Sequence, residues 1–402
     1  MRFDFETMLD RAGRDAMAVD LIGMPGGFAP AAPKEGFDAI PMWVADMSFA
    51  TAPSVIRAIE ARAAHPAFGY YMPSQAYFDA IIGWHVARNG TRGLAAEHIG
   101  YENGVLGGVA TALRAFTEPG DAVLLNSPYY VGFSGCVKRA GRRLEASPLV
   151  RDADGAWRMD FDDMDRRIVE NDIKLAIFCT PHNPCGRVWE RWELERAAEV
   201  FARRGVVVVS DEIWSDLVLG GRKHVPFQSV SDDARSRTVA LYAPTKTFNL
   251  AGLVGSYHVA YDEGLRERMR AAADATCYNS MNVLSMHALI GAYSEEGATW
   301  VDELCGVLRR NVGELCDFVD AVPGLEAARP EGTYMVFIDC AGWLAAHETT
   351  MDALLKALWD VGVAVQDGRQ FAGPTHIRAN TALPTSKLRE AIGRMGEYVF
   401  GE

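Results

Sequence analysis

Three polar residues that could take part in catalysis each follow an apolar, strand-like run in this 402-residue sequence. Asn183 follows "KLAIFCT", Asp211 ends "GVVVVSDE", and Lys246 follows "TVALYAP". A carboxylate behind four valines is expected to be partly buried, where it needs a cationic partner or strong donors because unpaired burial is costly. Lys246 is one of only seven lysines among 40 basic residues. Taken singly, Asp211 could form a structural ion pair or a helix cap, and Lys246 could be a solvated loop residue.

Two further segments could hold a flat, anionic ligand. The segment "ENGVLGGVATALRAF" places a glycine-containing turn at the start of a helix, where free N–H groups bind anions. It matches neither nucleotide-binding fingerprint, GxGxxG or GxxxxGK[ST]. In "SPYYVGF", Tyr129 and Tyr130 follow the strand "AVLLN", where an aromatic ring serves either as core or as a stacking platform.

One cofactor, pyridoxal 5′-phosphate (PLP), would use all five features. Its phosphate needs a helix N-terminus, and its ring needs an aromatic face and polar groups at the edge. Its pyridine nitrogen needs a carboxylate to stay protonated, and its aldehyde needs a lysine amine. The sequence therefore predicts PLP as the cofactor.

These motifs also resemble a known family. Asn183-Pro184-x-Gly186, Asp211, Lys246 and Arg378 in "HIRANTALP" are similar, in this order, to the class I/II aminotransferase superfamily of PLP fold type I. The resemblance covers essentially the whole chain. Within that superfamily, four segments are similar to the cystathionine β-lyase-like (MalY/PatB) C–S lyases: "PMWVADMSFATAP", "HPAFGYYMP", "TPHNPCGRVW" and "PTKTFNLAGL".

The resemblance implies a role for each matching residue. Lys246 would bind the cofactor covalently and later move the Cα proton of the substrate. Asp211 would pair with the pyridine N–H, and Asn183 would hydrogen-bond the 3-oxygen of the ring. Arg378 would bind the substrate carboxylate through a bidentate pair, which suits a planar guanidinium better than a lysine.

Further positions follow from the same resemblance. Tyr130 would stack on the ring, with Tyr129 as the alternative. The backbone N–H groups of Val105 and Leu106 would hold the phosphate. Tyr70 would reach the phosphate of a neighbouring subunit's cofactor, which implies a homodimer with shared active sites. The substrate-binding set is expected to comprise Trp43, Tyr70, Asn183 and Arg378.

Several positions depart from the family pattern. Trp214 stands where relatives usually carry Tyr or His, and an indole N–H can donate but not accept a proton. It is expected either to contact the cofactor or only to pack beside it. Ala243 replaces a serine that often binds phosphate, which leaves the hydroxyl of Thr245. Val254 replaces an arginine of the aspartate aminotransferase branch, which favours the lyase-like branch.

The resemblance favours a β-eliminating C–S lyase acting on an L-amino acid, with pyruvate, ammonia and a thiol as products. Transamination by the same residues is the alternative, and epimerisation and decarboxylation also stay open because the fold fixes the cofactor and not the reaction. A non-catalytic regulatory protein would not need Lys246. The segments "RAGRDAMAVD" (11–20) and 23–36 depart from the lyase-like group and favour a substrate other than cystathionine.

The elements that position these residues alternate between helix and strand from about residue 45. This pattern predicts an α/β fold with a large, mostly parallel sheet of the seven-stranded type, whose functional groups collect at the carboxyl ends of its strands. A smaller α+β unit is expected to follow. The expected divisions are an N-terminal arm (1–45), a large PLP-binding domain (46–290) and a small C-terminal domain (291–402).

The composition of the sequence limits the classes of partner and the location that are expected. The net charge of −13 argues against a general nucleic-acid binder. No apolar run is long enough for a membrane span, no secretory signal is evident, and the nine histidines lack metal-ligand spacing. Seven cysteines without a CxxC pair fit reduced thiols, so a cytoplasmic location is expected.

Overall fold

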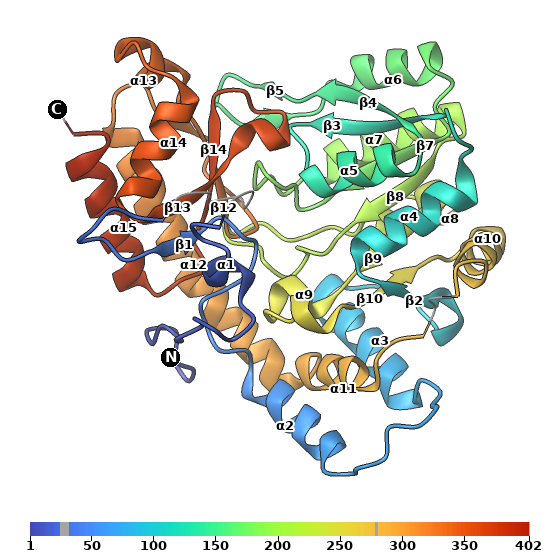
Figure 1. Ribbon diagram of the computed structural model, residues 1–402. Helices are drawn as coiled ribbons and strands as arrows, with labels where there is room; N and C mark the ends of the chain where they lie inside the picture. The colour runs from blue at the N-terminus through green and yellow to red at the C-terminus, as the bar shows by residue number, and fades with distance from the viewer. Residues whose placement is uncertain (25–31, 278–279, 402) are drawn as a thin grey trace.

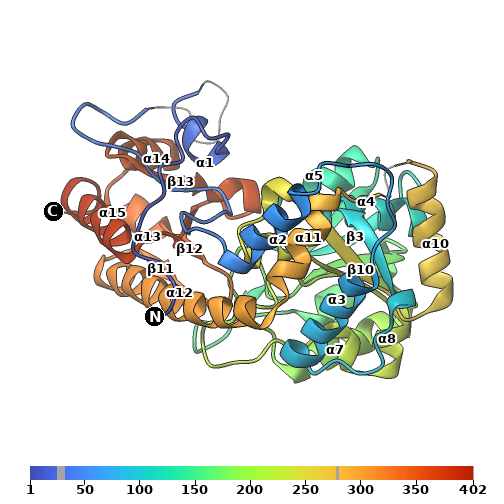
Figure 2. The same cartoon turned by 90° about the horizontal axis from the view of Figure 1, so that it is seen from below.

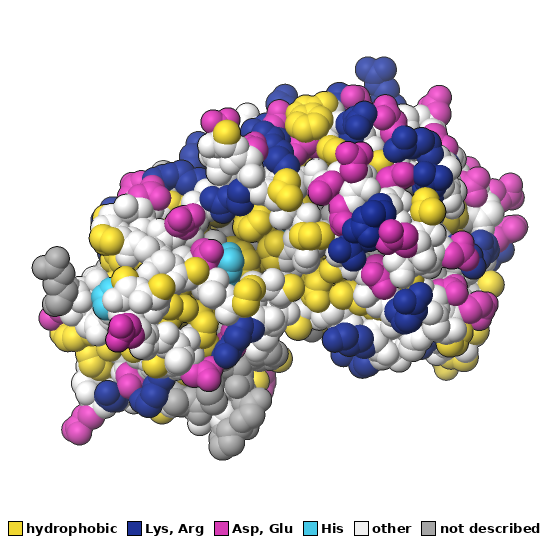
Figure 3. Space-filling model, turned by 90° about the horizontal axis from the view of Figure 1, so that it is seen from above, with side chains coloured by type: hydrophobic (Ala, Val, Ile, Leu, Met, Phe, Trp, Pro, Cys, Tyr) yellow, Lys and Arg dark blue, Asp and Glu magenta, His cyan; other side chains and the backbone are white. Residues whose placement is uncertain are grey.

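Two β-sheets organise the chain in the computed structural model, which describes residues 1–24, 32–277 and 280–401 (Figure 1). The expected irregular arm at 23–36 lies partly outside these residues, and its described part contains neither helix nor strand. Seen from above, the molecule has two lobes, and hydrophobic side chains gather in the hollow between them (Figure 3). Within the described residues, no helix is both long and apolar enough to cross a membrane.

The larger sheet has seven strands in the order β2-β10-β9-β8-β7-β3-β4. The five strands from β9 to β4 run parallel, whereas β10 is antiparallel to both β9 and β2. The mostly parallel sheet predicted from the sequence is therefore confirmed. Its strands are β2 (Ile99–Asn103), β3 (Ala122–Ser127), β4 (Arg143–Pro148), β7 (Leu175–Cys179), β8 (Val207–Asp211), β9 (Thr238–Tyr242) and β10 (Gly255–Val259).

Helices cover both faces of this sheet, so its strands are apolar on both sides. Successive strand residues point to opposite faces, which places Val209 in the cluster with α4 and Val208 in the cluster with α7. Helix α7 is followed by Gly205, whose φ of 67° closes the helix in the left-handed conformation. One face carries α4 (Val105–Phe116), α5 (Val131–Arg139) and α10 (Glu263–Asp274), and the other α6 (Phe161–Glu170), α7 (Arg191–Arg204) and α8 (Asp232–Arg237).

The smaller sheet has five strands in the order β1-β13-β14-β12-β11. Its first strand comes from the N-terminal segment and pairs in parallel with β13, so the two ends of the chain share one sheet. The expected division at residue 45 follows β1 closely and stays a proposal. The strands are β1 (Ile40–Met42), β11 (Glu326–Ala327), β12 (Met335–Asp339), β13 (Val363–Asp367) and β14 (His376–Asn380).

The long helix α12 (Glu295–Ala321) connects the two units: it contacts α2 and α11 near its start and α15 beside the smaller sheet (Figure 2). The strands β5 (Val150–Arg151) and β6 (Trp157–Arg158) form a separate ribbon. The remaining α-helices are α1 (Met17–Asp20), α2 (Pro53–Ala63), α3 (Gln75–Asn89), α9 (Pro244–Thr247), α11 (Val283–Ala292), α13 (Ala341–Ala346), α14 (Met351–Asp360) and α15 (Thr385–Tyr398). Short 3₁₀ helices are η1 (Ala96–His98), η2 (Phe227–Ser229), η3 (Ala251–Leu253) and η4 (Gly368–Phe371).

Candidate active site

A cavity of about 270 Å³ lies at the carboxyl ends of β7, β8 and β9. The three strands are parallel neighbours, so residues that follow each of them meet at one edge of the sheet. Asn183, Asp211 and Lys246, which are far apart in sequence, all line this cavity. Its other lining residues are Ala45, Gly104, Val105, Leu106, Tyr130, Cys179, Ile213, Trp214, Thr245, Ala251 and Val254.

Lys246 projects from the single-turn helix α9, which starts at Pro244 directly after β9. Its Nζ donates a hydrogen bond of 2.8 Å to the carbonyl of Ala45. Burial, and next the positive charge of Arg378, lower the pKa of this amine to about 8. A fraction of roughly one in ten is therefore unprotonated at pH 7, which a nucleophile or a general base requires.

Asp211 ends β8 and is only 4% exposed. Its Oδ1 accepts a hydrogen bond of 3.1 Å from the N–H of Ile213, and it forms no salt bridge within the described part of the chain. Burial raises the pKa of this carboxyl to about 7, although the N–H of Ile213 and the charge of Lys246 act in the opposite direction. Such a carboxylate is suited to a cationic ligand group that enters the cavity.

Asn183 lies in the turn after β7, and the fold of that turn depends on Gly186. Gly186 has a φ of 66°, and a Cβ there would lie 2.5 Å from Cβ of Pro330, so no other residue type fits without displacement. The side-chain oxygen of Asn183 accepts a hydrogen bond of 3.0 Å from Arg378. Its amide nitrogen makes no hydrogen bond within the described residues.

Arg378 enters from β14 of the smaller sheet and is buried. Its guanidinium lies 4.3 Å from the ring centroid of Phe371 and donates to Asn183, to the carbonyl of Trp43 and to Oε1 of Gln366. These acceptors are all neutral, and its Nε has no hydrogen-bond partner in the described structure. Burial lowers the pKa of Arg378 to about 10 because no carboxylate offsets its charge.

The first turn of α4 has backbone N–H groups that no side chain caps. Gly104 precedes it with a φ of 75° and no side chain caps it, so the N–H groups of Val105 and Leu106 remain available beside the cavity. Thr245 lines the same cavity. Ala243 offers no hydroxyl, and Val254, which has a φ of 61°, offers only an apolar side chain.

Tyr130 lines the cavity, whereas Tyr129 does not. The Tyr130 ring packs edge-on against Phe133 and lies over Gly132, where an added Cβ would be 2.4 Å from its Cε1. Because Gly132 has no side chain, there is room for the Tyr130 ring. The structure favours Tyr130 over Tyr129 as the stacking residue.

Trp214 also lines the cavity and is 2% exposed. Its ring packs edge-on against Tyr334 with centroids 4.8 Å apart, and Nζ of Lys246 lies 5.8 Å from its centroid. The indole thus forms an apolar wall next to the lysine, which strengthens the desolvation that lowers the lysine pKa.

Three expected residues are absent from the described lining of this cavity: Tyr70, Trp43 and Arg378, of which Arg378 is connected to it through its hydrogen bond to Asn183. Tyr70 is fully exposed on the segment between α2 and α3. The indole of Trp43 is buried and donates to the carbonyl of Ala18, and the carbonyl oxygen of Trp43 accepts a hydrogen bond from Arg378. Their substrate-binding roles stay proposals.

Sequence reasoning missed four contributors. Gln366 lies opposite Arg378 in the pairing of β13 with β14. The sequence feature that could have indicated it is a glutamine in the otherwise apolar run "VAVQ". Ala45 acts through its backbone, so its side chain gives no signal. Arg11 and Asp46 form a mostly buried salt bridge of 2.5 Å beside Ala45, and nothing in their spacing indicates this pairing.

The residues fit PLP on three observations. An uncapped helix N-terminus lines the cavity, together with a buried carboxyl that forms no salt bridge within the described residues and a lysine amine with a lowered pKa. A helix N-terminus binds phosphate, a carboxylate holds a protonated ring nitrogen, and an amine binds an aldehyde. The cavity therefore supplies one group for each end of this cofactor.

The chain belongs to the family Aminotransferase class I and II, whose sequence profile matches residues 38–395. PLP is the cofactor of this family. Cystathionine β-lyase PatB of Bacillus subtilis (strain 168) is 35% identical over 361 residues, which cover 89% of this chain and 92% of PatB.

Two solved structures share the fold over the whole chain. The PLP-bound C–S lyase from Staphylococcus hominis has a TM-score of 0.89 and 27% identity, covering 100% of this chain and 99% of that one. A PLP-bound putative aminotransferase from Clostridium difficile 630 has a TM-score of 0.90 and 30% identity, covering 99% and 100%. The resemblance to the PLP-dependent, cystathionine β-lyase-like group is confirmed.

Proposed function

We propose that this chain is a PLP-dependent C–S β-lyase that cleaves an L-amino acid carrying sulfur on Cβ. The substrate R–S–CH₂–CH(NH₃⁺)–COO⁻ and one water give the thiol R–SH, pyruvate and ammonium. The observation that carries the proposal is one cavity at the start of α4 that Lys246, Asp211 and Asn183 all line, with Arg378 hydrogen-bonded to Asn183. The names of PatB and of the Staphylococcus hominis lyase favour β-elimination over transamination.

Each residue would have one task. The N–H groups of Val105 and Leu106 would hold the cofactor phosphate, Tyr130 and Trp214 would enclose its ring, and Asp211 would hold the ring nitrogen protonated. When bound, PLP supplies an electron sink for the carbon that loses its proton.

The substrate would be held at the other side of the cavity. Arg378 would orient the carboxylate, with its unpartnered Nε as the free donor and Asn183 and Gln366 fixing the guanidinium plane. The amine of Lys246 would then take the proton from Cα. Its lowered pKa and its place against the indole of Trp214 suit it to that transfer at neutral pH.

The reaction test uses the PLP-loaded protein with L-cystathionine and no added 2-oxo acid. Pyruvate and ammonia formed in equal amounts support the lyase, and Lys246→Ala is expected to abolish them. Lys223→Ala, which removes an exposed lysine, is the matched control and keeps full activity. A strict requirement for an added 2-oxo acid would instead identify an aminotransferase, the activity that the Clostridium difficile protein is suggested to have.

We also propose a homodimer in which Tyr70 completes the partner's site, because its ring is fully exposed and lies outside its own cavity. Mixing inactive Lys246→Ala with inactive Tyr70→Phe tests this idea. Hybrid dimers contain one intact site, so activity approaching a quarter of the native value is expected; no recovery after subunit exchange would contradict the shared site. The seven unpaired cysteines support a cytoplasmic place of action.

A further inference from the structure

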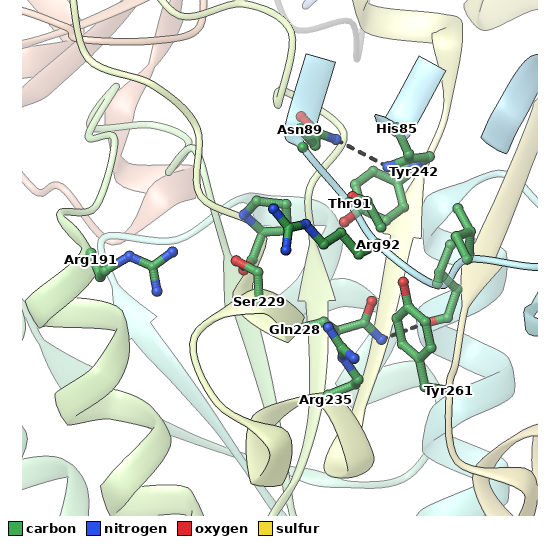
Figure 4. A pocket seen from close by; sticks show the side chains of 14 residues that line it. His85, Asn89, Thr91, Arg92, Arg191, Gln228, Ser229, Arg235, Tyr242 and Tyr261 are labelled. Atoms are coloured by element: carbon green, nitrogen blue, oxygen red, sulfur yellow. Dashed lines mark hydrogen bonds between the residues drawn. The ribbon is translucent and has the colours of Figure 1, made fainter. Parts of the chain in front are cut away.

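A second cavity, of about 360 Å³, opens on the face of β9 opposite α4. Its walls come from the loop after α3, the start of α7, η2, α8, and the ends of β9 and β10 (Figure 4). No residue lines both this cavity and the candidate active site. A ligand here would therefore be distinct from the cofactor and from the substrate of the proposed lyase.

The lining of this cavity has a positive charge that contrasts with the rest of the protein. Three arginines line it, Arg92, Arg191 and Arg235, and no aspartate or glutamate is among the described residues that line it. The whole chain has 53 acidic and 40 basic residues. A concentration of positive charge without lining carboxylates, in a protein of net charge −13, favours an anion in that hollow.

The side chain of Arg235 is oriented by an aromatic ring but has an unused hydrogen-bond donor within the described residues. Its guanidinium carbon lies 5.0 Å from the ring centroid of Tyr261, a cation–π contact that orients it. Its buried Nε has no hydrogen-bond partner within the described residues. A buried donor of this kind is usually satisfied by protein, water or ligand, so it indicates a missing acceptor.

The other two arginines are free to turn toward the same acceptor. Arg92 makes no hydrogen bond or ion pair in the parts of the chain that are described, and Arg191 has one exposed ion pair, 3.6 Å from Glu195. An exposed pair of this type contributes little to stability and is readily exchanged. Figure 4 shows the three guanidinium groups approaching from three different elements, with Gln228 and Ser229 between them.

We propose that this cavity binds a small organic phosphate monoester. Planar guanidinium groups form paired hydrogen bonds with phosphate oxygens, and the hydroxyl of Thr91 adds a further donor. The cavity has the size of a small-molecule site, larger than one phosphate needs. Its remaining wall, which includes the rings of Tyr242 and Tyr261, would contact the organic part.

The test is isothermal titration calorimetry of the PLP-loaded protein, freed of excess PLP, at low ionic strength. PLP must fill the first phosphate site so that it cannot contribute. Ribose 5-phosphate is expected to bind with a millimolar or lower Kd, inorganic phosphate at least tenfold more weakly, and ribose not measurably. Arg235→Gln and Arg92→Gln are each expected to weaken ribose 5-phosphate at least tenfold.

Arg196→Gln is the matched control, because Arg196 lies exposed on α7, 3.8 Å from Glu199, and does not line the cavity. The Arg196→Gln protein is expected to bind ribose 5-phosphate as tightly as the native protein does. Arg92 is also exposed, so its replacement keeps the test valid if Arg235→Gln fails to fold. No binding of ribose 5-phosphate, equal binding by all variants, or tighter binding of succinate or inorganic phosphate would each overturn the proposal.

Discussion

Asp211 offers a quantitative test of the site before any ligand binds. Its carboxyl is 4% exposed and has a pKa of about 7 in the folded protein without cofactor, against an ordinary value of 3.8. A group whose pKa is raised by folding stabilises the fold at low pH and loses that contribution as pH rises through the folded pKa. Ionised Asp211 therefore destabilises the cofactor-free protein, and Asp211→Asn is expected to stabilise it.

The magnitude follows from the pKa difference. The difference of about three between the two pKa values lowers the free energy of unfolding by about 4 kcal/mol at pH 8, where the carboxyl is ionised in both states. At pH 5 the carboxyl of Asp211 is protonated in the folded protein, whereas in the unfolded chain it is mostly ionised. Asp211 then lowers the free energy of unfolding by only about 2 kcal/mol. The stabilisation by Asp211→Asn is expected to grow by about 2 to 3 kcal/mol between pH 5 and pH 8.

Urea unfolding of the cofactor-free protein at the two pH values measures this difference. Asp162→Asn, which replaces an exposed carboxyl in the first turn of α6, controls for the chemical change. In the PLP-loaded protein the sign is expected to reverse, because the ring nitrogen then gives Asp211 its partner. A pH-independent gap between native and Asp211→Asn proteins would refute the reasoning that burial without a partner governs this carboxyl.

Three further predictions concern two glycines with positive φ, the hydrogen bond between Arg378 and Gln366, and the amine of Lys246. Gly205→Ala, with a φ of 67° and open space around its Cβ, is expected to cost about 1 to 2 kcal/mol in urea unfolding. Gly186→Ala, with a similar φ but a clash, is expected to cost at least about 1 kcal/mol more, and equal costs would contradict the clash. Gln366→Leu is expected to lower kcat/KM about tenfold in steady-state assays, because Arg378 loses an orienting acceptor; unchanged kinetics would exclude that role. The rate at which the cofactor-free protein takes up PLP, followed by visible absorbance, is expected to rise about tenfold per pH unit below pH 8 and to level off above it, because only unprotonated Lys246 reacts; a flat profile would contradict its lowered pKa.

The sequence allowed the central part of the fold and the candidate site to be predicted because both depend on local pattern. Short apolar runs ending in Asn183, Asp211 and Lys246 indicated parallel strands, and the carboxyl ends of such strands share one edge. The turn before α4 had a similarly local signal. Strand order, including the antiparallel β10, was not evident from these runs alone.

Contacts made by distant segments could not be predicted. Gln366 meets Arg378 only through the pairing of β13 with β14, and Ala45 meets Lys246 through a backbone carbonyl that any residue could supply. The second, arginine-lined cavity brings together Arg92, Arg191 and Arg235, which are up to 143 positions apart and follow no periodicity. Only the tertiary structure shows that these residues are neighbours.

The neutral surroundings of Arg378 have a consequence for the choice among ligands. Its acceptors are an asparagine, a glutamine and a backbone carbonyl, so its positive charge stays uncompensated inside the protein until an anion arrives. An amino-acid amide or ester has the same shape as the acid near Cα but carries no negative charge there. In its proposed role, the buried guanidinium would therefore select free amino acids over their amides, their esters and the interior residues of peptides, whatever side chain they carry.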